Sequence, residues 1–218
     1  MIDFKSLWKD TWEEQKASQI ASKGFTGADV RAGGRATKEW PNKEDENWWM
    51  AHGPDMVKSW VDWRERSGYQ IADMGDGNPG IEVGITTEIG GLPVKMFIDR
   101  VMYIPKDGEV TRDNFVVLDL KSGKSAPKSD LQLAFYATGI EIAYGWKPRW
   151  GTYWMARTGE TSPLIDLDQY PRDMFEDIIG KFKTARDNEV FLPNLNHCVM
   201  CSVVEFCKYR NSNLWRIK

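Results

Sequence analysis

Two acidic residues and a lysine stand in apolar segments whose composition is typical of β-strands. Asp119 and Lys121 lie in the run NFVVLDLK at 114–121, and Asp99 ends the apolar run FID. Because strand side chains alternate between faces, we expect Asp119 and Lys121 on one face, about 6.6 Å apart along the chain. An acid on the buried face of an apolar strand costs free energy unless a partner compensates it. That cost indicates a functional role.

Pairing of the two strands would bring Asp99 beside Asp119. Two carboxylates about 4 Å apart repel by about 4 kcal/mol at an effective dielectric of about 20, so a divalent cation is the natural occupant between them. Such a set suits phosphodiester hydrolysis, in which Lys121 would steer a water molecule or stabilise charge at phosphorus. Alternatively, Asp119 and Lys121 form an ion pair on an edge strand and Asp99 caps a turn.

The elements that must position these residues follow an α/β pattern. Helical spacing of apolar residues predicts helices over 5–22, 54–68, 131–145 and 170–188. Alternation predicts strands over 81–89, 92–104 and 151–157, the first two joined as a hairpin at Gly90-Gly91. A composition rich in β-branched residues predicts a short central strand over 114–121, buried on both faces. Pro54 is expected in the first helical turn, which places His52 just ahead of the helix or on a kinked turn. Together they predict helices around a mixed sheet.

Length and composition favour one globular domain. The chain has 218 residues, of which 41% are apolar and 28% charged. Within a single domain over 1–218, we expect an N-terminal helix and loop over 1–47, a core over 48–190 and a cysteine segment over 191–218. The net charge of −3 provides no overall field that attracts a polyanion, so nucleic-acid binding would have to be local.

Targeting signals are not expected in this chain. MIDFKSLWKD has no apolar leader, and no run of eighteen apolar residues that could span a membrane occurs. With only three cysteines, a reducing compartment is expected, which means the cytoplasm, of a host cell if the chain is viral.

The order of these motifs resembles that of the PD-(D/E)xK nuclease superfamily, and within it the RecB-like exonucleases, including the CRISPR-associated branch. The matching motifs are His52, Glu82, FIDRV at 97–101, VVLDLKSGK at 116–124 and LQLAFYA at 131–137. The resemblance covers about residues 48–137. It implies a restriction-endonuclease-like core, a mixed β-sheet flanked by helices, followed here by the C-terminal cysteine-rich segment.

The resemblance also implies roles for individual residues. Asp99 and Asp119 would bind Mg²⁺ or Mn²⁺, and Lys121 would be the catalytic lysine. Gln132 and Tyr136 would line the site, since positions i and i+4 share a helical face.

The resemblance implies two further metal ligands, and each of them has an alternative interpretation. His52 would be a ligand, or else a histidine bonded locally at a helix start. Glu82 would be a secondary acidic ligand, with Glu88 as a competitor that is expected to face solvent near the turn.

Several residues are candidates for contact with DNA. Arg100, Lys124 and Lys128 could receive phosphates. Eleven tryptophans are present, and large rings are expected mainly in the core. The alternative is a platform on which bases stack, for which Trp48 and Trp49 are the candidates.

The resemblance and the residues together predict a Mg²⁺- or Mn²⁺-dependent DNA nuclease. The resemblance alone implies exonuclease action on single-stranded or free ends, in replication or recombination of a virus or mobile element. Two alternatives are an endonuclease of the same fold and a non-catalytic DNA-binding protein with structural metal sites. No residue indicates a protein partner.

The three cysteines form a separate cluster near the C-terminus. Cys198, Cys201 and Cys207 have the spacing C-x2-C-x5-C, which suits a soft-ligand metal site. In the RecB-like exonucleases this spacing, with one upstream cysteine, holds a [4Fe–4S] cluster. That upstream cysteine is absent here. The fourth ligand would be His197 or a carboxylate, the metal could be zinc, or the cysteines are unrelated.

Overall fold

A computed structural model of the chain describes residues 2–24, 38, 44–75, 77–106, 108–123, 125–190, 201, 203, 205–207 and 209. The chain forms two compact units. The larger contains Met1–Thr87 and Lys95–Pro171, and the smaller contains Glu88–Val94 and Arg172–Lys218. The domain boundaries expected at residues 47 and 190 remain predictions.

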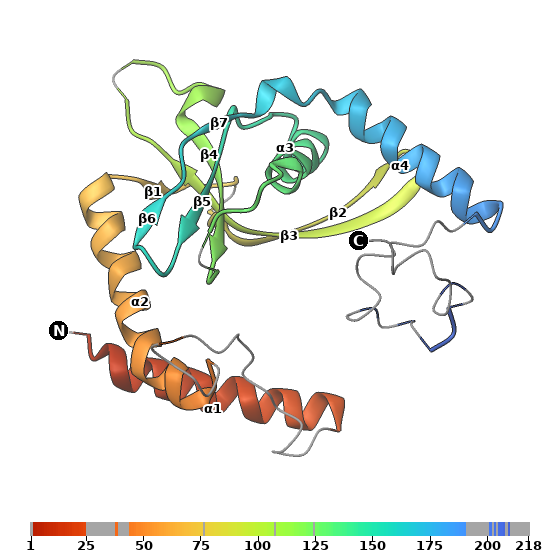
Figure 1. The fold of residues 1–218 in the computed structure, drawn as a ribbon. Helices are drawn as coiled ribbons and strands as arrows, with labels where there is room; N and C mark the ends of the chain where they lie inside the picture. Colours follow the sequence, from red (N-terminus) through yellow and green to blue (C-terminus); the bar gives the residue numbers. More distant parts are fainter. Residues whose placement is uncertain are drawn as a thin grey trace. The chain divides into compact units, whose positions relative to one another are not determined.

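A mixed β-sheet forms the centre of the larger unit (Figure 1). β3 (Leu92–Tyr103) pairs antiparallel with β4 (Phe115–Lys121), and β4 pairs parallel with β5 (Trp150–Met155). Parallel neighbours need a crossover connection, and α3 (Leu131–Tyr144) lies between β4 and β5 in the chain. The mixed sheet flanked by helices confirms the predicted fold class.

Shorter strands extend this sheet. β2 (Ile81–Ile89) pairs with β3, as the predicted hairpin requires, and β1 (Gln70–Ile71) also pairs with β3. β6 (Glu160–Thr161) and β7 (Ile165–Asp166) both pair antiparallel with β5. The 3-10 helices η1 (Arg112–Asn114) and η2 (Leu167–Gln169) precede β4 and follow β7.

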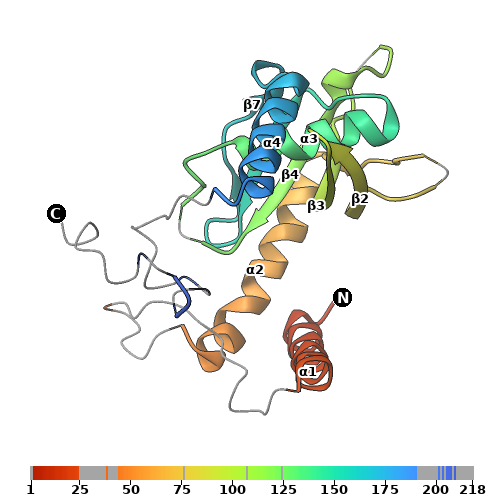
Figure 2. The same ribbon diagram turned by 90° about the vertical axis from the view of Figure 1, so that its right-hand side faces the viewer.

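The two faces of β4 pack against different helices. Leu118 and Val116 are fully buried in a cluster with Trp63 of α2 (Glu46–Ser67). On the other face, Gly151, which pairs with Val117, lies against a leucine of α3. Burial of each large apolar side chain contributes about 1.5–3 kcal/mol. α2 and α3 therefore cover opposite faces of the sheet (Figures 1 and 2).

The start of α2 differs from the sequence prediction. The helix begins at Glu46, because the Asp45 side chain caps it by accepting a hydrogen bond from the Trp48 amide. Pro54 lies inside the helix, where its missing N–H removes one helical hydrogen bond. His52 therefore lies within α2, and its expected place ahead of the helix is wrong.

Tryptophans join α1 (Phe4–Lys23) to α2. The ring of Trp8 covers Gly53, where any Cβ would collide with the indole. Trp8 also stacks on Trp49, with ring centroids 6.5 Å apart. Nearby, Glu46 accepts hydrogen bonds from Trp12 and Lys16, both 3.0 Å long. Trp8, Trp12 and Trp49 are only partly buried, whereas the core role expected for most tryptophans is confirmed for Trp48, Trp63 and Trp154.

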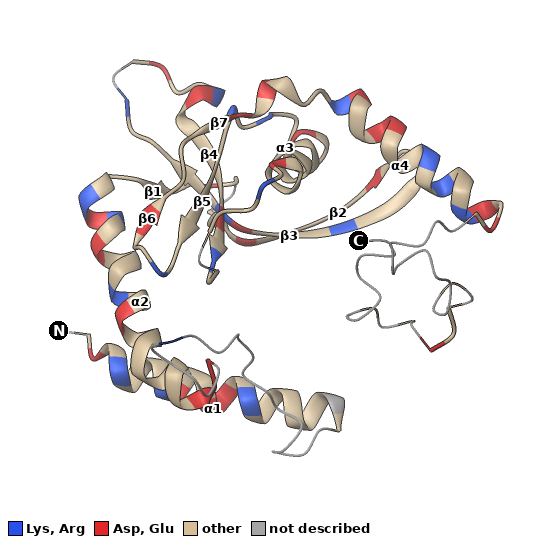
Figure 3. Cartoon of the chain, in the orientation of Figure 1, with Lys and Arg blue, Asp and Glu red and all other residues tan. Residues whose placement is uncertain are grey.

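The smaller unit contains α4 (Arg172–Asp187) and the turn of the β2–β3 hairpin. Gly90 has φ 55° and lies against the backbone of α4, so a side chain there would collide with it. Residues of both charges are distributed along α4 and along α1 (Figure 3), which is typical of solvated helix faces. Within the described ranges, no helix is both long and apolar enough to cross a membrane.

Candidate active site

The candidate site lies at the end of β4. Asp119 is almost fully buried, and its Oδ1 accepts a 3.0 Å hydrogen bond from Gln132 of α3. Leu118 packs on the opposite face, in the cluster with Trp63. The alternation that was expected for this strand is therefore confirmed, and Asp119 faces α3.

Asp99 reaches the same place from β3. Its Oδ2 accepts a 2.8 Å hydrogen bond from the backbone amide of Leu120. The last paired residues of the two strands are Arg100 and Leu118. The Asp99 carboxylate therefore accepts its hydrogen bond just beyond the paired segment. The Asp99 side chain thus lies beside the peptide that links Asp119 to Leu120.

The backbone of β3 is irregular at this point. Met96 lies against Gly139 of α3, whereas Met102 packs with Trp63 of α2, although strict alternation would place both on one face. The pleat therefore changes face between them, in the stretch that contains Asp99 and Arg100. Such a local irregularity redirects side chains at the end of a paired segment.

Electrostatics disfavour the ionised form of Asp119. Desolvation by burial raises the pKa of its carboxyl, and the negative charge of Asp99 raises it further, whereas Lys121 lowers it. Oδ2 of Asp119 lies 2.6 Å from Nζ of Lys121. This oxygen is buried, and the Lys121 ammonium is the charged group that faces it.

Gln132 and Tyr136 complete the cluster. Oε1 of Gln132 accepts a 3.0 Å hydrogen bond from Lys121 Nζ, and its Nε2 donates to the Tyr136 hydroxyl at 2.9 Å as well as to Asp119. These three contacts determine which way the amide is oriented. Gln132 therefore holds the acid and the lysine in fixed positions.

Tyr153 of β5 forms the floor beside this cluster. It pairs with Asp119 in the register of β4 and β5, and its hydroxyl donates a 3.0 Å hydrogen bond to the carbonyl of Ser129. Burial raises the pKa of Tyr153 to about 12, and the charges of Asp130 and Asp119 act in the same direction. The hydroxyl therefore stays neutral near pH 7.

Glu82 and His52 have other partners. Glu82 is exposed, has φ 48°, and pairs with Nη1 of Arg100 at 3.3 Å. His52 stacks on Trp48, and its Nδ1 lies 2.8 Å from the Trp48 carbonyl oxygen, a local bond of the kind considered as the alternative to metal binding. No group of three His, Cys, Asp or Glu side chains suited to a metal occurs in the described parts of the chain.

The predicted DNA contacts have different surroundings. Trp48 is only 8% exposed, and its ring lies against His52 and the Arg157 guanidinium, so little of it is open to a base. Trp49 is partly exposed, Lys128 is exposed, and the competitor Glu88 is exposed as expected. Lys124, Cys198 and His197 lie outside the described residues. Cys201 and Cys207 are free thiols with partial exposure.

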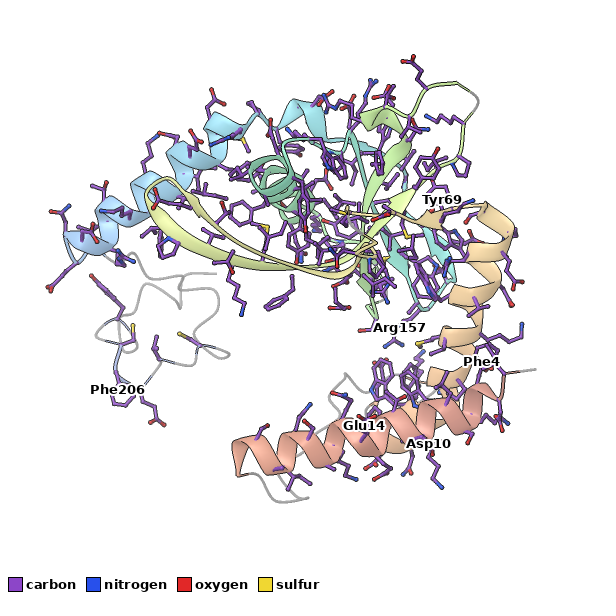
Figure 4. The ribbon with its side chains drawn as sticks, turned by 180° about the vertical axis from the view of Figure 1, so that it is seen from behind. Phe4, Asp10, Glu14, Tyr69, Arg157 and Phe206 are labelled. Carbon is purple, nitrogen blue, oxygen red and sulfur yellow. The ribbon has the colours of Figure 1, made fainter. Side chains whose placement is uncertain are left out.

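Sequence reasoning missed Arg157. Its Nη2 pairs with Oε2 of Glu44 at 2.5 Å, and its Nε donates to the carbonyl of Ser122, directly after β4. Figure 4 shows Arg157 between the end of the sheet and the aromatic side chains around α1 and α2. Glu44 and Arg157 are far apart in the sequence, and no local pattern connects them.

Comparison with known proteins identifies the family. A model of the PD-(D/E)XK nuclease superfamily matches residues 12–208. The chain belongs to this superfamily. Two related proteins, both called Gene 69 protein, are from Mycobacterium phages D29 and L5. The D29 protein is 29% identical over 196 residues, which cover 80% of this chain and 69% of the phage protein. The L5 protein is 28% identical in an alignment 218 positions long, which covers 80% of this chain and 70% of the phage protein.

Membership of the PD-(D/E)XK superfamily confirms the expected restriction-endonuclease-like core and indicates a nuclease, with nucleic acid as its substrate class. Nucleases of this superfamily usually use divalent metals such as Mg²⁺. The residues present fit such an ion. Asp119 has a buried carboxylate oxygen that is balanced by the Lys121 ammonium, Asp99 adds a second carboxylate, and Mg²⁺ prefers oxygen ligands of this kind.

Proposed function

We propose that the chain is a Mg²⁺- or Mn²⁺-dependent deoxyribonuclease of the RecB-like branch, acting as an exonuclease on single-stranded DNA ends. The observation that carries this proposal is the cluster of Asp99, Asp119, Lys121 and Gln132, where the end of β4 meets the middle of β3. In a non-catalytic protein, a buried acid with a raised pKa would cost free energy without any functional benefit.

Each residue of the cluster has a distinct role in this proposal. Asp99 and Asp119 would hold the cation, which polarises the phosphoryl oxygen and acidifies a water molecule when it is bound. Lys121 would stabilise the negative charge that develops at phosphorus. Gln132 would keep Lys121 and Asp119 in place, with Tyr136 as its own support. Glu82 would join as a ligand only if Arg100 released it. The contact of His52 Nδ1 with the Trp48 carbonyl is compatible with a ligand role, because metal-binding histidines commonly donate their other ring N–H to a carbonyl.

The DNA would follow basic side chains near the cluster. Arg100 is adjacent to Asp99, and its guanidinium donates a hydrogen bond to the Asp99 carbonyl. Lys128 is exposed shortly before α3, and Lys124 completes the predicted set. Phosphate contacts of this kind position a strand without reading its sequence.

The biological setting follows from the relatives. Both are proteins of mycobacterial phages, which supports the proposal of a viral role in DNA replication or recombination. Such an enzyme would act on phage DNA in the cytoplasm of the host cell.

Purified protein incubated with Mn²⁺ and two DNA substrates tests the proposal. We expect end-labelled linear single strands to be degraded progressively while circular single strands stay intact. Cutting of the circles would instead identify an endonuclease of the same fold. Binding of DNA without cleavage of either substrate, in Mg²⁺ or Mn²⁺, would overturn the enzyme assignment and leave a DNA-binding protein.

We also propose a second metal at Cys198, Cys201 and Cys207, either a [4Fe–4S] cluster or zinc, supported by the clustering of all the cysteines within one short segment. Elemental analysis and absorbance near 400 nm after anaerobic purification distinguish the two. Protein that carries neither iron nor zinc would contradict this proposal.

A further inference from the structure

A pocket of about 410 Å³ lies on the α2 face of the sheet, within the larger unit. Aromatic rings dominate its walls, with Trp8 from α1, Trp49 and Trp60 from α2, and Trp154 from β5. Its volume is within the range of pockets that bind small organic groups. The apolar lining favours a flat, uncharged ring system over a phosphate or a sugar.

The pocket lies on the opposite face of the sheet from the Asp119 carboxylate and meets the candidate active site at Lys121, the last residue of β4. Lys121, which contacts Asp119 at 2.6 Å, also lines the pocket. Arg100, a second lining residue, donates a hydrogen bond to the backbone carbonyl of Asp99. The only two charged side chains among the described residues that line the pocket are therefore both cationic and both contact the acids of the site.

Two hydrogen-bond donors in the pocket walls have no partner. The indole N–H groups of Trp8 and Trp154 are buried and make no hydrogen bond within the described chain, and Trp154 is only 4% exposed. A buried donor without an acceptor costs about 1–3 kcal/mol. These N–H groups have almost no accessible surface, so a ligand would contact the apolar, aromatic lining of the pocket and not the two donors. A flat aromatic ligand fits such walls, and nucleobases have the required flat faces.

We propose that this pocket, which we call the base pocket, binds one unstacked nucleobase of the strand whose phosphate is cleaved. The base stacks on the tryptophan rings, and Arg100 and Lys121 receive the phosphates that flank it. This inference rests on the proposed nuclease function and deepens it, because a base inside a duplex is stacked and paired and cannot enter. The base pocket thus selects strands with unpaired nucleotides at the site.

Binding of short oligothymidylates with a single abasic residue tests the base pocket. Affinity is measured by fluorescence anisotropy in EDTA, where the strand is not cleaved, with the abasic residue moved along the oligonucleotide. We expect one position at which loss of the base weakens binding about tenfold, the size typical of base–aromatic stacking. At the other positions, loss of the base should change the affinity little.

Trp49→Ala identifies where that base is bound. In this variant the sensitivity to the abasic position should disappear, because the stacking partner is gone. Phe97→Ala is the matched control, since Phe97 is an exposed aromatic residue of β3 that does not line the pocket. It should keep the full effect. Val57→Phe fills the base pocket from α2 and should abolish the effect even if Trp49→Ala fails to fold.

Two results would overturn the proposal that the pocket binds a base. The first is equal affinity of the wild-type chain for oligonucleotides with the abasic residue at any position. The second is an effect of the abasic position that is unchanged in both Trp49→Ala and Val57→Phe. Either result leaves the nuclease proposal intact if the wild-type chain cleaves DNA with Mg²⁺ or Mn²⁺. Absence of cleavage overturns the nuclease proposal while the binding measurement still reports on the pocket.

Discussion

The backbone amide of Leu120 donates a 2.8 Å hydrogen bond to the side chain of Asp99. This contact joins the end of β4 to the middle of β3 through a carboxylate, just beyond the last paired residues of the two strands. It brings the negative charge of β3 next to the buried acid of β4, and that charge raises the pKa of Asp119. In the absence of a cation, the neighbouring carboxylates of Asp99 and Asp119 therefore cost free energy, which is expected of residues that serve a function.

Asp119→Asn should abolish cleavage without destabilising the metal-free protein. The asparagine keeps an acceptor for Gln132 but removes a buried negative charge that desolvation and Asp99 disfavour. We expect DNA cleavage in Mn²⁺ to fall at least about a hundredfold and the melting temperature in EDTA to stay the same or rise. Cleavage at the wild-type rate would show that Asp119 is not part of the active site.

Gln132→Ala should lower kcat more than it raises KM. The amide contacts Asp119, Lys121 and Tyr136, so its loss leaves the acid and the lysine without a common support. Loss of such a supporting contact typically costs about tenfold to a hundredfold. Steady-state kinetics on a labelled single strand measure the change. An unchanged kcat with a raised KM would instead assign Gln132 to DNA binding alone.

Tyr153→Phe should alter the stability of the fold at alkaline pH. The folded-state pKa of about 12 exceeds the ordinary value of 10.0, so the neutral hydroxyl contributes stability that is fully present below pH 10 and is lost as pH rises toward 12. Urea unfolding at several pH values compares the two proteins. The wild-type advantage, about 1 kcal/mol for the bond to Ser129, should shrink over that window. A constant difference would contradict the raised pKa.

Arg157→Ala should destabilise the larger unit by about 3 kcal/mol, because it leaves the buried carboxylate of Glu44 without its partner. Arg66→Ala is the matched control. Arg66 pairs with Glu160 at 2.8 Å, but both side chains are mostly exposed, and the loss should stay below about 1 kcal/mol. Chemical denaturation measures both. Equal small losses would show that the Glu44 pair is no more important than a surface contact.

Local patterns in the sequence predicted the strand of Asp119 and Lys121, the hairpin that carries Asp99, and the α/β class. Each depends on alternation or periodicity within a few residues, which is the information a sequence displays directly. The motif order supplied the PD-(D/E)xK superfamily, which the comparison confirmed, and the RecB-like branch, which remains a prediction. The metal-binding roles of Asp99 and Asp119 remain predictions.

Other features depend on contacts between distant segments. The start of α2 was placed too late because Pro54 suggested a first helical turn, whereas the Asp45 cap and the packing of Trp8 on Gly53 extend the helix in the other direction. The pairing of Arg157 with Glu44 and the convergence of Trp8 and Trp154 on one pocket have no local signature. Tertiary packing decides such positions.

Titration with Mn²⁺ tests most directly whether Asp99 and Asp119 share one cation. Calorimetry would compare the wild-type chain with Asp99→Asn, Asp119→Asn and the double variant, and with Asp113→Asn as a control, since Asp113 pairs with Arg149 outside the cluster. We predict that either single change removes most of the binding, that the double variant loses little more, and that the control binds normally. Unchanged Mn²⁺ affinity in both single variants would contradict the shared site and the nuclease mechanism built on it.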